Sequence, residues 1–383
     1  MHSDLLKNRK SQQNDLPKPS SSRKLKLPAF FPDATYATIH SLPFHEIKDI
    51  VPGFVVTTLH FHLLGIERLL QSTGGFKNFS HLPDETVLLS DSGGFQVLSL
   101  INRRGLGKIK DEGAQFIDPD TKKKVLLTPE LSQEIQKNIQ SDIRTVLDVP
   151  LMGDEDEKTT RDALEQTTKW AKRAKESYLK LEELSESDFV NTKPLLVEDS
   201  ITFSRPLLNA VVQGGNSVDL RKESAEQLSA VGFDLFGFGG WPVDSEGKLQ
   251  TDILEAFVEH TPSDSIRYGM GIGTPDDIAT CYKIGITLFD CVIPSRNARH
   301  GTLYVTKGNG EKAGHTFDTI HIRNSRYQFD QQPLDTDCNC PTCRNYSRSY
   351  LRFLWKHKNP VAYSLLTLHN IWWYQNFILE LSR

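Results

Sequence analysis

The chain has 383 residues, of which 38% are hydrophobic and 25% charged, and its formal net charge is −4. This length allows one large domain with a substantial core, or two ordinary ones. No run approaches the roughly 18 to 20 apolar residues of a membrane helix, and residues 1–10 are too polar for a secretory signal, so we expect a cytoplasmic protein without a membrane partner.

In chain order, residues 1–27 are rich in Ser, Lys, Asn and Gln and are predicted to form a flexible or partly paired N-terminal arm. After them, short apolar runs alternate with amphipathic segments, which is typical of β/α units. The predicted strands, each running into a polar or glycine-rich loop, are Val87–Ser90, Thr145–Leu147, Ala210–Val212, Leu235–Gly237, Tyr268–Met270 and Ile286–Phe289. The predicted helices are Pro129–Gln140, Lys158–Leu184, Asp219–Val231 and Pro275–Ile284.

This alternation predicts an α/β fold, a (β/α)8 TIM barrel over residues 28–330, followed by a metal-binding subdomain over residues 331–383. Asp91, Asp148, Gln213 and Asp290 stand at or directly after strand ends. In such a barrel the carboxyl ends of the strands form the active face, so these side chains are candidate site residues. A doubly wound sheet would also place polar groups there and is the alternative fold.

Paired carboxylates suit the cleavage of a glycosidic bond, because one can bond to or stabilise the anomeric carbon while the other acts as acid and then base. A helix N-cap is the ordinary alternative role for any one of these aspartates, Asp91 included. Three glycine pairs stand near these residues: Gly93-Gly94 after Asp91, Gly214-Gly215 after Gln213, and Gly239-Gly240. Because glycine has no side chain, the backbone at these pairs leaves room for a planar base.

Four strings resemble the signature blocks of the tRNA-guanine transglycosylases, in the order in which that family has them. They are Asp91–Gln96 (DSGGFQ), Val212–Gly215 (VQGG), Met270–Pro275 (MGIGTP) and Phe289–Gly301 (FDCVIPSRNARHG). The resemblance covers the chain from about Leu27 to its end. It implies an enzyme that exchanges guanine 34, at the anticodon wobble position of tRNA, for a 7-deazaguanine base such as preQ1 or queuine.

The resemblance also implies a role for individual residues. Asp290 matches the nucleophile that bonds to C1′ of the ribose, and Asp91 matches the general acid and base. Arg296 and Arg299 match arginines that contact tRNA. The residues that match the base pocket are Ser92, Phe95, Asp148, Gln213, Gly239, Gly240 and Met270, with Phe95 and Met270 expected on the two faces of the base.

Three segments depart from the family pattern. Asp148-Val149-Pro150 is closer to archaeal members than to the bacterial Asp-Glu-Cys. Gly239–Ser245 reads GGWPVDS in place of the usual GGLAVGE, so the expected glutamate is absent and Glu246 follows one position later. Thr57–His60 reads TTLH where the family has NTYH. These departures leave the choice of base open.

The cysteines indicate a metal site. Cys338, Cys340 and Cys343 are clustered, and His369 follows 26 residues after the last of them. Three thiolates and one imidazole satisfy a tetrahedral Zn²⁺ with no open position, which marks a structural site. The family resemblance supports one structural zinc per chain and a homodimer. The alternative for the cysteines is a redox-active or merely buried group. For the apolar C-terminal helix, the alternative to dimer contacts is packing on the same chain.

Other functions would fit parts of the same pattern. A paralogue could insert a 7-deazaguanine base into DNA, and a non-catalytic partner subunit could bind RNA through the barrel. A glycoside hydrolase would explain the carboxylates, but neither the block around Asp290 nor the cysteine cluster.

Overall fold

Eight parallel strands form the centre of the computed structural model, which describes residues 22–306 and 317–383. Their order in the sheet is β2-β14-β13-β12-β11-β8-β4-β3. A parallel bridge between Asp33 and Val55, with a 2.7 Å hydrogen bond from Ala34 N to Val55 O, joins the two edges of the sheet. The predicted barrel is therefore confirmed. The strands are β2 (Ala29–Pro32), β3 (Gly53–Thr57), β4 (Val87–Asp91), β8 (Ile143–Thr145), β11 (Leu207–Val212), β12 (Leu235–Phe238), β13 (Ile266–Gly269) and β14 (Leu288–Cys291).

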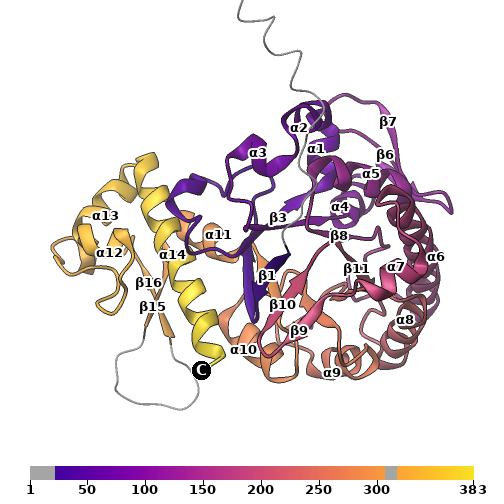
Figure 1. The fold of residues 1–383 in the computed structure, drawn as a ribbon. Coiled ribbons are helices and arrows are strands. Elements are labelled where there is room, and N and C mark those ends of the chain that lie inside the picture. The colour runs from indigo at the N-terminus through magenta and orange to yellow at the C-terminus, as the bar shows by residue number, and fades with distance from the viewer. Residues whose placement is uncertain (1–21, 307–316) are drawn as a thin grey trace, which may run out of the picture.

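Helices surround the sheet (Figure 1). Each of the four predicted helices is present with ends within three residues of the prediction: α5 (Pro129–Ile139), α6 (Glu157–Leu181), α8 (Val218–Val231) and α10 (Pro275–Lys283). Side chains cap their N-termini, as where Thr128 accepts a hydrogen bond from Leu131 N. The other helices of the barrel are α1 (Thr58–Leu63), α2 (Glu67–Thr73), α3 (Phe76–Ser80), α4 (Gly94–Arg104), α7 (Glu186–Asn191), α9 (Thr251–His260) and α11 (Ile293–Arg299).

The interior of the barrel is filled by alternate residues of its strands, because successive side chains of a strand point to opposite faces. Val87 and Leu89 of β4 belong to the interior cluster, as does Leu288 of β14. Continuing the same alternation brings Asp91 and Asp290 to the inner side at the carboxyl end of each strand. The same alternation of side chains that fills the barrel interior thus also points both carboxylates inward at the carboxyl-terminal end of the barrel, which we call the mouth.

Two small antiparallel sheets are added to the barrel. The first pairs β1 (Arg23–Lys26) with β10 (Ser200–Phe203) and β9 (Leu195–Val197), and its apolar residues Leu25 and Ile201 join the interior cluster. Residues 23–26 of the predicted arm therefore form a paired strand, in line with a partly paired arm, while residues 1–21 lie outside the described residues. The second sheet joins β5 (Gly107–Ile109), β6 (Ala114–Ile117) and β7 (Lys124–Leu127).

The C-terminal part stands beside the barrel (Figure 1). It contains the hairpin β15 (Thr302–Thr306) and β16 (Phe317–His321), then α12 (Pro341–Asn345), α13 (Arg348–Lys356) and α14 (Pro360–Leu381). Helix α14 is tied to the barrel by Tyr374 Oη, which donates to Gly273 O at 2.8 Å, and by Gln375 Nε2, which donates to Phe30 O at 3.0 Å. Most of its apolar side chains are buried against this chain, as one of the two alternatives predicts.

The predicted start of the subdomain at residue 331 falls inside one packed cluster, since Tyr327 and Leu334 lie on either side of it and both belong to that cluster. Among the residues described, no helix combines the length and the apolar character that a membrane crossing requires.

Candidate active site and metal-binding cluster

Asp290 lies near the end of β14 and accepts two hydrogen bonds on the same oxygen. Tyr268 Oη donates to Asp290 Oδ1 at 2.7 Å, and Gly271 N donates to it at 2.8 Å. Burial raises the pKa of Asp290 to about 6, although these hydrogen bonds oppose the rise, and the negative charges of Asp91 and Asp33 add to it. The two donors fix the carboxylate and still leave Oδ2 outside these two contacts.

Asp91 ends β4, in register with Thr57 of the neighbouring strand. Its carboxylate accepts hydrogen bonds from the side chain of Gln96 and from the backbone of Ser92 and Gly93. Burial nevertheless raises its pKa, because removal from water disfavours the charged form. A raised pKa makes the carboxyl group easier to protonate than a free one, which favours a role as general acid and base.

Asp148 and Gln213 form a polar pair that is more buried than Asp91 and Asp290. Gln213 Nε2 donates to Asp148 Oδ2 at 2.6 Å, and both side chains are buried. Burial, followed by the charge of Asp91, raises the pKa of Asp148 to about 7, while hydrogen bonds from Gln213 and the buried Ser92 lower it. Gln213 Oε1 is buried and, among the described residues, has no hydrogen-bond partner. An acceptor without a partner in a buried site is a place for a ligand donor.

Glycine is required around this pair. A Cβ at Gly94 would stand 2.6 Å from Asp148 Oδ1, and one at Gly239 would stand 2.5 Å from Gln213 Nε2. Gly240 adopts a φ of +94°, which disfavours side chains. These predicted glycines therefore let the backbone approach the polar pair closely.

The predicted stacking residues lie on different sides of the site. Phe95 is 46% exposed in the first turn of α4. Met270 follows β13 and packs inward, so that a Cβ at Gly237 would meet its sulfur at 2.7 Å. Arg296 is exposed and Arg299 half-buried on α11, directly after β14, and the charge of Asp33 acts on Arg299.

The sequence-based prediction missed three residues at this mouth: Asp33, Tyr268 and Gln96. Asp33 follows β2, and its charge raises the pKa values of Asp91 and Asp290. Tyr268 is an inward residue of β13 that donates to Asp290. The alternation of inward residues along these strands was the available signal, and Gln96 stood in the DSGGFQ string without an assigned role.

Thr57 and Glu246 stand in or next to the segments that depart from the family pattern. Thr57 Oγ1 lies 3.1 Å from Thr35 Oγ1. Glu246 is exposed at the tip of a hairpin turn, where its backbone N donates to Asp244 Oδ1 at 2.9 Å. The partners of Asp290 in this chain are thus Tyr268 and Gly271.

All four predicted metal ligands come together. The ligand atoms of Cys338, Cys340, Cys343 and His369 lie within 4.8 Å of one another. His369 Nδ1 is 3.7, 3.6 and 3.3 Å from the three sulfurs in that order. His369 Nε2 lies 2.7 Å from the carbonyl oxygen of Tyr304, which orients the ring so that Nδ1 faces the cysteines. This Cys3His cluster is able to bind a metal ion.

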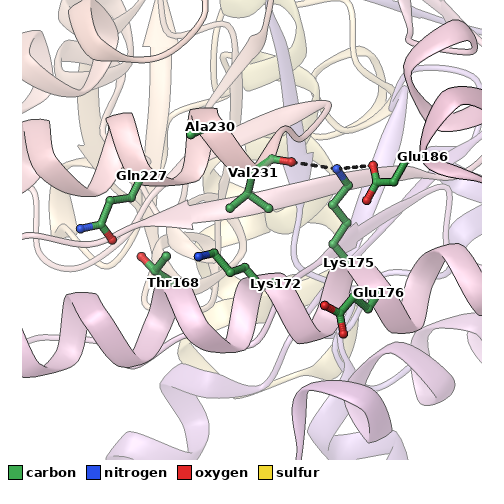
Figure 2. A pocket seen from close by; sticks show the side chains of 8 residues that line it. All are labelled: Thr168, Lys172, Lys175, Glu176, Glu186, Gln227, Ala230 and Val231. Carbon is green, nitrogen blue, oxygen red and sulfur yellow. Dashed lines mark hydrogen bonds and ion pairs between the residues drawn. The ribbon is translucent and has the colours of Figure 1, made fainter.

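A hollow of about 500 Å³ on the outer surface, between α6 and α8, does not belong to either site (Figure 2). Lys175, one of its two lysines, is engaged, since Nζ donates to Val231 O at 2.8 Å and pairs with Glu186 at 2.9 Å. That carbonyl belongs to the last residue of α8, so Lys175 caps the end of the helix. The role of Lys175 is structural.

Comparisons with known proteins agree with this geometry. The profile of the queuine tRNA-ribosyltransferase family matches residues 17–382. A queuine tRNA-ribosyltransferase of Thioalkalivibrio sulfidiphilus is 36% identical over 357 residues, covering 92% of this chain and 85% of the relative. Those of Psychrobacter cryohalolentis and Francisella tularensis are 35% and 33% identical, covering 92% and 94% of this chain and 84% and 88% of the relatives. The chain therefore belongs to the queuine tRNA-ribosyltransferase family of pentosyltransferase enzymes.

Proposed function

We propose that this protein exchanges guanine 34 of tRNA for a 7-deazaguanine base through a covalent bond between Asp290 and the ribose. The observation that carries the proposal is the pair of partly buried carboxylates at one barrel mouth: Asp290, held by Tyr268 and Gly271, and Asp91, whose pKa is raised. The family match supports a ribosyl transfer on tRNA.

In the first half-reaction, the ionised carboxylate of Asp290 attacks C1′ of the ribose. The C1′–N9 bond breaks, its electron pair leaves with the guanine, and the proton of Asp91 goes to the departing base. In the second half-reaction Asp91 takes a proton from the incoming base, whose nitrogen bonds to C1′ as the ester bond to Asp290 breaks. Asp91 is then protonated again, and the cycle closes without another reactant.

The polar pair Asp148 and Gln213 reads the edge of the base. Guanine and 7-deazaguanine carry N–H donors on one edge, and the acceptor Gln213 Oε1 is without a protein partner among the described residues. Ser92 supports Asp148, and the backbone at Gly239 and Gly240 lines the same pocket. Phe95 and Met270 contact the two faces of the base, while Arg296 and Arg299 contact the RNA backbone.

The metal that fits the cluster is a structural Zn²⁺, held by Cys338, Cys340, Cys343 and His369. Bond lengths of about 2.3 Å to sulfur and 2.0–2.1 Å to nitrogen at a tetrahedral ion place nitrogen and sulfur roughly 3.5 Å apart. The distances of 3.3–3.7 Å from His369 Nδ1 match that value. When bound, the ion crosslinks the loop before α12 to α14 and contributes no reaction step.

The protein is also proposed to act as a homodimer that uses the exposed aromatic side chains beside the metal cluster. Phe329 is 83% exposed, Phe353 57% and Tyr350 45%. Aromatic side chains are enriched at protein interfaces, so these exposed rings are candidates for the dimer contact. Sedimentation of the wild type beside Phe353→Ala tests this, since the dimer predicts a doubled mass that the substitution reduces.

Exchange of labelled guanine tests the function. The wild type is incubated with an RNA anticodon hairpin containing the target guanosine, beside a DNA hairpin of the same sequence. Label in RNA alone supports the proposal, and label in DNA alone would make the protein a DNA-modifying paralogue. RNA binding without exchange, with guanine or a 7-deazaguanine, would indicate a non-catalytic partner subunit and contradict the proposal.

A further inference from the structure

A second aromatic ring stands beside Phe95 at the rim of the active site. Trp241 follows Gly240 directly and is 44% exposed, close to the 46% of Phe95. The two rings are nearly parallel, with an interplanar angle of 15° and centroids 6.5 Å apart. Two nearly parallel exposed rings beside the buried polar pair offer flat faces on which a planar ligand can stack.

The loop that carries Trp241 is fixed in place. Val243 and Leu249 form an antiparallel bridge, and Gln250 N donates to Pro242 O at 2.9 Å. The Gln250 side chain donates in turn to Asn216 Oδ1 at 3.1 Å, which ties the hairpin to the loop after β11. Trp241 is thus presented by an anchored hairpin, so the ring loses little freedom when it binds a ligand.

The burial of side chains divides the site into a floor and a rim. Asp148, Gln213 and Ser92, which are proposed to surround the exchanged base, are 7%, 0% and 0% exposed. Trp241 stays far more open, as expected of a ring that meets the part of the RNA remaining outside the pocket. Exposed Arg296 on α11 lies at the same end of the barrel and offers a charge for the phosphates.

We propose that Trp241 stacks on an unpaired RNA base next to the exchanged nucleotide, an assignment that rests on the proposed function. A nucleotide that enters a pocket leaves its stack, and its neighbour loses a stacking partner. An indole ring can replace that partner for any base, because every base has a π-face. Since Trp241 is nearly parallel to Phe95, a base on Trp241 lies nearly parallel to a base held by Phe95.

Binding to RNA that lacks single bases tests this assignment without requiring turnover. Three hairpins are compared: one intact, one without the base on the 5′ side of the target guanosine, and one without the base on its 3′ side. Each is titrated with Asp290→Asn protein carrying Trp241, Trp241→Ala or Trp241→Phe. Leu195→Ala, on the exposed strand β9, is the control that should leave binding unchanged.

Trp241→Ala is expected to weaken binding of the intact hairpin about tenfold, and Trp241→Phe to recover most of the loss. Removal of one flanking base should weaken binding to the Trp241 protein by a similar factor and leave Trp241→Ala unaffected. If Trp241→Ala weakened binding of all three hairpins by the same factor, the assignment would be overturned. It would also be overturned if Trp241→Ala bound the intact hairpin within twofold of the protein that keeps Trp241.

The free base provides the second readout. In otherwise wild-type protein, Trp241→Ala should leave KM for guanine within about twofold, since the loss falls on RNA. A raised KM for guanine with unchanged RNA binding would move Trp241 into the base pocket and overturn the assignment. If the hairpins bind as expected but the wild type exchanges no base, the failure lies in the proposed function and not in the contact between Trp241 and RNA.

Discussion

The barrel mouth and the Cys3His cluster both gather polar side chains in a buried place, but they satisfy them differently. In the cluster, three sulfurs surround His369 Nδ1, and its other ring nitrogen is held by the Tyr304 carbonyl, so one ion completes every ligand. At the mouth, Asp91, Asp148 and Asp290 all have raised pKa values, and Gln213 Oε1 lacks a protein partner among the described residues. The first arrangement is suited to hold a structure, whereas the second is suited to bind a base and to exchange protons.

The largest effect should come from the nucleophile. Asp290→Asn removes the charge but keeps an oxygen that can accept from Tyr268 and Gly271, so exchange should fall by more than about 10⁴-fold. Exchange of labelled guanine, with circular dichroism and metal content as controls, measures this. Near-normal exchange would assign the nucleophilic role elsewhere.

Loss of a metal ligand should act on stability instead. Cys343→Ser is expected to lower the free energy of unfolding of the C-terminal region by about 3 kcal/mol or more, since metal binding contributes directly to folding there. Thermal unfolding with metal analysis measures it, and a chelator should reproduce the effect on the wild type. Unchanged unfolding after verified loss of the metal would contradict a structural role.

The pH dependence of exchange should report the ionisation of Asp290. Because the nucleophile acts as the anion, kcat/KM should fall about tenfold per pH unit below its pKa of about 6. The Tyr268 hydrogen bond lowers that pKa, so Tyr268→Phe should move the acidic limb to higher pH. A limb that does not move would mean that another group sets it.

A smaller effect is expected on the free energy of unfolding, through the ionisation of Asp290. The pKa of Asp290 is raised from 3.8 to about 6 in the folded state, so the folded protein binds more protons than the unfolded chain in that interval. The stability that Asp290 contributes to the wild type is therefore lost as the pH rises from 3.8 to about 6. Asp290→Asn should be more stable by about 1–3 kcal/mol at pH 8 and about equal to wild type at pH 3, below the unfolded pKa of 3.8. Denaturant unfolding at both pH values measures the difference, and a gain that is the same at both would exclude its electrostatic origin.

The sequence predicted the parts of the molecule that follow local patterns. Strand periodicity located six of the eight barrel strands, and helix periodicity located the helices α5, α6, α8 and α10. The spacing of the cysteines with His369 identified the candidate metal ligands. Strand β8 ends at Thr145, before the predicted Val146–Leu147, so Asp148 follows an irregular segment. An apolar run alone does not mark where the ladder stops.

Contacts between distant elements were the part that local patterns could not supply. The hydrogen bond from Tyr268 to Asp290 depends on the alignment of β13 with β14, and the charge of Asp33 acts at the mouth because β2 and β3 close the barrel. Trp241 was recognised only as a departure from the family pattern, and its pairing with Phe95 required the folded chain.

The most direct test of the central claim is to isolate the covalent intermediate. Wild-type protein is incubated with the RNA hairpin while released guanine is removed, then denatured, digested and examined by mass spectrometry. The proposed function predicts a ribose-linked RNA fragment on the peptide that contains Asp290, and none with Asp290→Asn. An adduct on the peptide that contains Asp91, or exchange without any adduct at Asp290, would contradict it.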